Sequence, residues 1–164
     1  MLIETPTLHL MCGKIASGKS TQAAKLGEGC RTVVISEDDW LAALYLDEMS
    51  SLSDYVRCSS KLQKIMELHI VSLLNAEVSV VLDFPANTIS NRAWMRGIIQ
   101  TTNASHKLHY LDVPDDVCKA RLHARNSMGD HPFAATEEQF VRLSEHFAPP
   151  TPEEGFDVVV HSFT

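Results

Sequence analysis

The sequence has few of the features that mark secreted or membrane proteins. Its 164 residues include only four cysteines, and Cys12, Cys30, Cys58 and Cys118 form no Cys-x-x-Cys pair. Such spacing is typical of reduced thiols and favours neither a zinc site nor a disulfide framework. No apolar run reaches the length of a membrane span, and the first residues lack the basic segment of a signal peptide. We therefore expect a cytoplasmic protein with no membrane partner.

Positive charge is also scarce. Fourteen Lys and Arg against twenty-one Asp and Glu give a net charge of −7 with His neutral. Because contacts to nucleic-acid phosphates need clustered basic residues, this balance argues against a nucleic-acid partner but leaves room for a small basic pocket. The chain also has no Asn-Lys-x-Asp run of the kind that recognises guanine, which disfavours a GTPase.

Five short apolar segments predict five strands, at residues 7–11, 32–36, 78–84, 107–113 and 157–161. They are rich in Val, Leu and Ile, and their continuity is typical of strands buried on both faces of a parallel sheet. Segments with helical spacing lie between them, at about 17–27, 53–76, 91–102, 115–126 and 136–147. The last has Thr136 as an N-cap, with Glu138 too close for a capping box. The alternation predicts an α/β fold, a single domain over residues 1–164 with a five-stranded parallel sheet and helices on both faces.

The run Gly-Lys-Ile-Ala-Ser-Gly-Lys-Ser at residues 13–20 follows the first predicted strand and opens the first predicted helix. This is the G-x-x-x-x-G-K-[ST] pattern, in which glycines turn backbone N–H groups toward a β-phosphate, Lys19 reaches the β- and γ-phosphates and Ser20 ligates Mg²⁺. The helix N-terminus adds positive potential. We predict ATP and Mg²⁺ as cofactors, with the nucleotide bound by Gly13, Lys14, Ala16, Ser17, Gly18, Lys19, Ser20 and Thr21.

Two acidic residues follow the second predicted strand. In an open parallel sheet, ligands bind beyond the carboxyl ends of the strands, which places Asp38 and Asp39 near the phosphate loop. There Asp38 would act as general base on an acceptor hydroxyl, and Asp39 would contact the substrate. The alternative is that Ser36 caps a helix and the two acids only favour its N-terminus.

A second acidic site ends the third predicted strand. Asp83 closes an apolar run in the manner of a Walker B carboxylate, which holds the Mg²⁺ shell together with Ser20. The alternative is a strand-ending Asp that caps a turn. Downstream, Asn87 and Arg92 are candidate substrate contacts, and so is Arg57 in the long predicted helix.

Arg121 and Arg125 are spaced i,i+4 and so share one face of a predicted helix. Directed at the transferring phosphate, two guanidinium groups would stabilise its charge, although such a pair is also common on solvated faces. The Gly-containing stretch that follows suits a mobile lid, and we place the lid region at about residues 121–136.

Together, "GKIASGKST", "SEDDW", "VVLDFPAN" and "LDVPDDVCKARLHARN" resemble, in this order, the P-loop kinase group that includes polynucleotide 5′-hydroxyl kinases, zeta-toxin-type kinases, chloramphenicol phosphotransferase, and gluconate and shikimate kinases. The resemblance covers most of the chain and is nearest to polynucleotide-kinase-like domains. It implies strand order 2-3-1-4-5, Asp38 as general base, Asp83 as a metal or substrate carboxylate, and Arg121 and Arg125 as lid arginines.

Two departures from that pattern bear on the acceptor. Polynucleotide kinases usually carry an aromatic residue and then a phosphate-gripping Arg after the acidic pair, whereas here Trp40 is followed by Leu41. The segment after Asp83 is also "FPAN" instead of a short Thr-Asn step. We therefore expect a kinase acting on a hydroxyl of a small molecule. The alternatives are a polynucleotide or nucleotide-sugar kinase, and a nucleotide-binding regulatory module without transfer.

Overall fold

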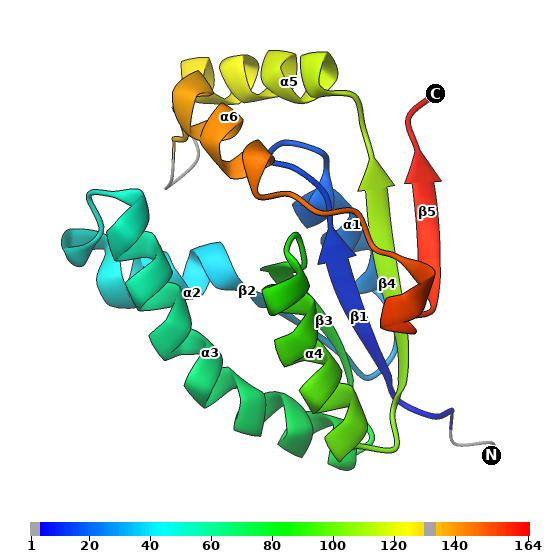
Figure 1. Cartoon of the computed structure of the whole chain (residues 1–164). Coiled ribbons are helices and arrows are strands. Elements are labelled where there is room, and N and C mark those ends of the chain that lie inside the picture. The colour runs from blue at the N-terminus through cyan, green and yellow to red at the C-terminus, as the bar shows by residue number, and fades with distance from the viewer. Residues whose placement is uncertain (1–3, 130–133) are drawn as a thin grey trace.

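The computed structural model describes residues 4–129 and 134–164, whose strands form one five-stranded sheet (Figure 1). The strand order is β2-β3-β1-β4-β5, and every pairing is parallel. The strands are β1 (Thr7–Cys12), β2 (Thr32–Ser36), β3 (Ser79–Pro85), β4 (Ser105–Asp112) and β5 (Val158–Ser162). The predicted fold class and strand order are confirmed.

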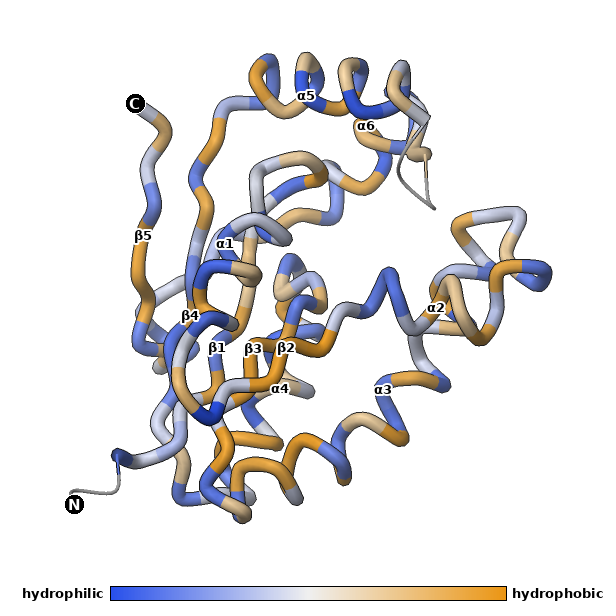
Figure 2. The backbone as a smooth tube through the Cα atoms, turned by 180° about the vertical axis from the view of Figure 1, so that it is seen from behind, coloured by the Kyte–Doolittle hydropathy of each residue, from blue (hydrophilic) through white to orange (hydrophobic). Residues whose placement is uncertain are grey.

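The helices lie on both faces of this sheet. They are α1 (Lys19–Leu26), α2 (Glu37–Tyr45), α3 (Leu52–Asn75), α4 (Ile89–Thr101), α5 (Asp115–Met128) and α6 (Glu137–Glu145), with short 3₁₀ turns η1 (Leu46–Glu48) and η2 (Pro152–Glu154). Figure 1 shows α3 and α4 in front of the sheet, and the view from behind shows α1 on the opposite face (Figure 2). No helix within 4–129 and 134–164 combines the length and apolarity needed to cross a bilayer.

Alternation along the strands divides the core between the two faces. Leu8 and Leu10 of β1 belong to the larger cluster, which packs against α3 and α4, whereas Met11 belongs to the smaller cluster with Ala23 of α1. Strands buried on both faces need apolar residues in both registers, which explains the continuous runs in the sequence. On α3 the buried positions recur at helical spacing, at Cys58, Leu62, Met66, Ile70 and Leu74.

Helix starts are fixed by hydroxyl caps. Ser36 caps α2 and Ser51 caps α3, each accepting a backbone N–H three residues on. The expectation that Thr136 lacks a capping box is wrong, because Gln139 and not Glu138 completes it: the Gln139 side chain accepts from the Thr136 N–H at 2.9 Å.

The proposed lid region is helical over its first part. Helix α5 continues through Met128, and Gly129 ends it with a left-handed φ of 69°. Residues 130–133 of the predicted lid lie outside the described residues, and α6 begins just beyond it at Glu137. Arg121 and Arg125 therefore project from a regular helix.

Candidate active site

The phosphate loop connects β1 to α1 with a backbone that most side chains would not permit. Gly18, the N-cap of α1, has φ 102°, and Ala16 also lies in the left-handed region at φ 61°. A Cβ at Gly13 would collide with the Ser17 hydroxyl, so the loop closes tightly on itself. Alternating left- and right-handed residues turn successive N–H groups toward one side and make a concave anion site.

The Lys19 side chain folds back over the phosphate loop. Its ammonium donates to the carbonyls of Gly13 at 2.6 Å and Lys14 at 3.0 Å. Burial lowers the pKa of Lys19, while the charges of Asp83 and Asp38 act in the opposite direction. The ammonium thus lies at the loop within the field of two carboxylates, where it is placed to meet phosphate oxygens.

Ser20 and Asp83 meet at the end of β3. The Ser20 hydroxyl donates to Asp83 Oδ2 at 2.9 Å, although the two residues are far apart in sequence. Burial raises the pKa of Asp83, and the hydrogen bond from Ser20 and the charge of Lys19 oppose that rise. No group of three or more His, Cys, Asp or Glu able to hold a metal occurs in the described part of the chain. One hydroxyl and one carboxylate nonetheless fit Mg²⁺, which uses few protein ligands and completes its shell with phosphates and water.

Asp38 lies beside these groups. In the β2–β3 register, Ser36 is opposite Asp83, so the turn into α2 starts at the same edge of the sheet as the Asp83 carboxylate. Asp38 is half-buried in the first turn of α2, and its charge acts on both Lys19 and Asp83. Ser36 does cap α2, through the Asp39 N–H at 3.3 Å. The capping interpretation is therefore correct for Ser36 and Asp39 and compatible with a place for Asp38 at the phosphate loop.

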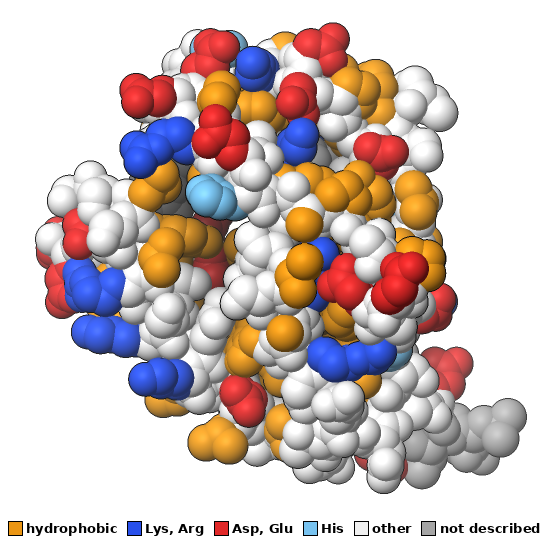
Figure 3. All heavy atoms as spheres, in the orientation of Figure 1, with side chains coloured by type: hydrophobic (Ala, Val, Ile, Leu, Met, Phe, Trp, Pro, Cys, Tyr) orange, Lys and Arg blue, Asp and Glu red, His pale blue; other side chains and the backbone are white. Residues whose placement is uncertain are grey.

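A hollow separates the α2–α3 lobe from the rest of the molecule in the space-filling view, and acidic side chains are visible inside it (Figure 3). The first turn of α2 carries three acids in a row, Glu37, Asp38 and Asp39.

Arg121 extends from α5 to the phosphate loop. Its guanidinium donates to the Ser17 carbonyl at 3.3 Å and lies over the Phe163 ring at 5.6 Å. Arg125, one turn further, is partly buried, and its Nε has no hydrogen-bond partner among the described residues. A buried guanidinium N–H without an acceptor is costly in a closed site and is the type of group that an incoming anion satisfies.

Asn87 does not have the substrate-facing role expected for it. Its side chain accepts from the Gly13 N–H at 2.9 Å and donates to the Gly13 carbonyl at 2.8 Å. Both halves of the amide are therefore used on one backbone residue. The structure assigns Asn87 to holding the entrance of the phosphate loop against the end of β3.

Arg92 is a clearer correction. It is fully buried, pairs with Glu154 at 2.7 Å and donates to the carbonyls of Ala86 and Ala148. A guanidinium engaged in this way ties α4 to the segment before β5 and is not available to a substrate. Arg57 pairs with Asp54 and Glu48 on the exposed side of α3, and no contact between it and the phosphate loop occurs among the described residues.

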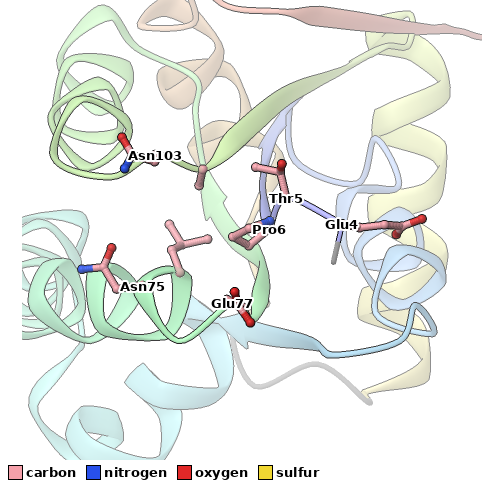
Figure 4. A pocket seen from close by; sticks show the side chains of 8 residues that line it. Glu4, Thr5, Pro6, Asn75, Glu77 and Asn103 are labelled. Atoms are coloured by element: carbon pink, nitrogen blue, oxygen red, sulfur yellow. The ribbon is translucent and has the colours of Figure 1, made fainter. Parts of the chain in front are cut away.

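Two further hollows lie outside this cluster. One, of about 430 Å³, is lined by Glu4, Asn75, Glu77 and Asn103 at the amino ends of the strands, which is the edge opposite the phosphate loop (Figure 4). The other, of about 310 Å³, lies beside Lys14 and is lined by the end of β4 and by Ser144, Phe147 and Pro149. Of these two, the second adjoins the phosphate loop, at Lys14.

Sequence reasoning missed Glu37 as a site residue. It begins α2, is 2 % exposed, and accepts hydrogen bonds from Tyr55 and Ser59 of α3. The i,i+4 spacing of Tyr55 and Ser59 is the one signal that was available, because it places two hydroxyls on the same helical face.

Comparison with solved structures gives the same fold at low sequence identity. A Chloroflexus aurantiacus protein whose kinase assignment is itself provisional superposes with a TM-score of 0.75 at 18% identity, over 97% of this chain and 86% of that one. Chaetomium thermophilum Kti12 in complex with ADP-AlF3 gives 0.70 at 13% identity, over 96% and 89%. The Mycobacterium tuberculosis APS kinase CysC, in complex with AMPPNP and APS, gives 0.63 at 18% identity, over 96% and 88%.

Comparison with curated proteins yields no match. The family model AAA_33, described as an AAA domain, matches residues 8–150, which include the phosphate loop, Asp38, Asp83, Arg121 and Arg125. The match covers most of the chain and agrees with the fold shared with kinases of the P-loop class. The chain therefore belongs to the AAA_33 family of AAA domains.

Proposed function

We propose that the protein is an ATP-dependent kinase that transfers the γ-phosphate of ATP to a hydroxyl group of a small molecule. The observation that carries the proposal is the position of Asp38, whose charge acts on Lys19 and Asp83 across the phosphate loop. A protein that only binds nucleotide needs the loop, Lys19 and a metal carboxylate. A kinase needs a second acid beside the phosphate loop, because a proton must be removed from the acceptor hydroxyl.

The loop and Lys19 would bind the phosphates of ATP. Backbone N–H groups of the loop between Gly13 and Lys19 would face the β-phosphate, and the Lys19 ammonium would exchange its carbonyl partners for phosphate oxygens. Ser20 and Asp83 would hold Mg²⁺, which when bound neutralises charge on the β- and γ-phosphates. Asn87 keeps Gly13 in place, so the loop is set before ATP arrives.

Asp38 would then act on the acceptor. It accepts the hydroxyl proton while the acceptor oxygen bonds to the γ-phosphorus, the bond to the bridging oxygen breaks, and ADP leaves with that bond's electron pair. Asp39, at the exposed start of α2, would contact the substrate beside it. Arg121 and Arg125 would stabilise the charge on the transferring group from the side of α5.

Two features support a small acceptor over a polynucleotide. Leu41, where polynucleotide kinases usually carry a phosphate-gripping Arg, is fully buried and cannot contact a ligand. The net charge of −7 also opposes a long polyanion. A screen of ATP consumption against sugars, antibiotics, nucleosides and 5′-hydroxyl oligonucleotides would identify the acceptor class. Turnover with the oligonucleotides alone would replace this proposal with a polynucleotide kinase.

The decisive variant is Asp38→Asn, which keeps size and removes the base. We expect Mg-ATP affinity by calorimetry to persist while acceptor phosphorylation falls by about a hundredfold or more. Asp47→Asn, in the exposed turn after α2, is the matched control and should behave as wild type. Full turnover in Asp38→Asn would remove it as base, and lost ATP affinity would assign Asp38 to the metal. Nucleotide binding without transfer to any acceptor would support a regulatory module.

A further inference from the structure

A buried carboxylate joins α2 to α3 directly next to the proposed base. Glu37 is the first residue of α2 and is 2 % exposed. The Tyr55 hydroxyl donates to its Oε1, and the Ser59 hydroxyl donates to its Oε2 at 2.8 Å. Tyr55 and Ser59 stand one turn apart on α3, so each oxygen of a single carboxylate is bound by a different turn of the facing helix.

This arrangement costs stability. The pKa of Glu37 is raised to about 7, mainly because the carboxyl group is buried; the bonds from Tyr55 and Ser59 oppose the rise, and the charges of Asp38 and Asp83 add to it. A leucine at this position would pack against α3 without desolvating a carboxyl group, as Leu41 does one turn later. The carboxylate provides something that apolar packing does not, which is two hydrogen bonds in fixed directions.

Those directions matter because Glu37 lies between the helix cap and the proposed base. Ser36 caps α2 on one side of Glu37, and Asp38 adjoins it on the other. The Ser36 cap reaches the backbone N–H of Asp39, an exposed residue of the same turn. The Glu37 side chain, by contrast, is buried and ties the turn that carries Asp38 to a second helix, α3.

We infer that Glu37 is a positioning residue, whose carboxylate, bound by Tyr55 and Ser59, fixes the first turn of α2 and so aims Asp38 at the phosphate loop. The inference rests on the proposed function for its consequence in catalysis, but the orientation of the turn is a separate property. Misplacing a reacting group by about 1 Å costs up to roughly a hundredfold in rate. Loss of the Glu37 bonds should therefore lower turnover and leave ATP binding intact.

The test combines kinetics with a reporter on the same turn. Trp40 lies in that turn and is 41 % exposed, and Trp94 is the only other tryptophan, so Trp94→Phe provides a background in which Trp40 alone fluoresces. In this background we would compare Glu37→Ala, Glu37→Gln, Tyr55→Phe and Ser59→Ala. Ser60→Ala is the matched control, because Ser60 is an exposed neighbour whose hydroxyl donates to the Val56 carbonyl of its own helix.

For Glu37→Ala we expect a shifted Trp40 emission and a kcat lowered about tenfold to a hundredfold, with Mg-ATP affinity unchanged. Glu37→Gln, which still bonds to both hydroxyls, should recover most of the rate. Combining Glu37→Ala with Asp38→Asn should lower kcat no further than Asp38→Asn alone, since both act on one group. If Glu37→Ala does not fold, Tyr55→Phe and Ser59→Ala carry the same test with one bond removed each.

The inference would be overturned if Glu37→Ala, or both Tyr55→Phe and Ser59→Ala, left the Trp40 emission and the kcat per nucleotide-binding site unchanged. Additive losses in the double variant would also overturn it. The emission measurement needs no acceptor and no transfer activity. A protein without kinase activity would thus refute the proposed function while Trp40 still reports whether Glu37 holds the turn.

Discussion

The two halves of the proposed active site, one for the nucleotide and one for the acceptor, are held by different kinds of contact. In the nucleotide half, residues 13–20 and the end of β3, backbone groups dominate: Asn87 and Lys19 both bind carbonyls or N–H groups of the loop. In the acceptor half, the first turns of α2 and α3, side chains bind side chains, as Tyr55 and Ser59 do with Glu37. A backbone site recognises phosphate whatever its source, whereas a side-chain site can be rebuilt for another acceptor without disturbing the loop.

We expect the largest effect from a substitution in the nucleotide half. Lys19→Ala removes the ammonium that meets the β- and γ-phosphates, so acceptor phosphorylation should fall by about a thousandfold and Mg-ATP affinity should fall with it. Lys25→Ala, in the last turn of α1, is the matched control. Unchanged affinity and turnover in Lys19→Ala, measured by calorimetry and ADP release, would contradict the phosphate-loop assignment.

The α5 arginines lie on the nucleotide side, where Arg121 contacts the Ser17 carbonyl, and we expect them to affect the rate more than binding. Replacing both Arg121 and Arg125 by Lys keeps charge but loses planar, bidentate geometry, so we expect kcat to fall by about tenfold or more. Arg142→Lys, in the last turn of α6, is the control. If the double Lys variant and the wild type had equal kcat, Arg121 and Arg125 would have no role in transfer and would be ordinary residues of a solvated helix face.

Arg92 and Arg57 were both predicted from the sequence to contact the substrate, and we expect their substitutions to differ in their effect on stability. Arg92→Met breaks a buried ion pair with Glu154, so it should lower stability by about 3 kcal/mol and leave turnover per folded molecule unchanged. Arg57→Met removes exposed pairs and should cost less than about 1 kcal/mol. Urea denaturation would measure the loss of stability in each variant, and kinetics on the same samples would measure kcat. A lower kcat in folded Arg92→Met would restore its role at the substrate.

A row of histidines outside both halves gives a smaller, pH-dependent effect. His109 of β4 bonds to His9 of β1 and to His161 of β5, each at 3.0 Å. Burial and then the charges of His9, His161 and Lys107 lower the pKa of His109 from 6.5 to about 4. The unfolded chain binds this proton between those two values and the folded chain does not, so stability should fall as pH drops from 6.5 to 4.

In His109→Gln this pH dependence should flatten, because the group with the lowered pKa is gone. Melting temperatures at several pH values between 7 and 4 would measure the effect, with His69→Gln on the exposed side of α3 as control. An equally steep acid loss in His109→Gln would show that other groups cause it. Turnover per folded molecule at pH 7 should be unaffected, since the row lies in neither half of the site.

The sequence alone determined what depends on neighbours in the chain. The phosphate loop is a contiguous motif whose glycines and Lys19 have roles set by local backbone geometry, and the second strand was predicted at its observed bounds, Thr32–Ser36. The continuous apolar runs predicted a parallel sheet, because strands that are covered by helices on both faces carry apolar residues at successive positions. Strand order came from resemblance to a family, not from the pattern of the residues.

Only the tertiary structure decided which polar side chains meet. Asn87 binds Gly13 across 74 residues, Arg92 binds Glu154 across 62, and Glu37 bonds to residues 18 and 22 positions away. A side chain's type does not reveal whether it faces a ligand or a partner in the core, since an arginine suits either. That choice depends on which groups the sheet brings within about 3 Å, because leaving a buried polar group unpaired costs more free energy than a typical hydrogen bond contributes.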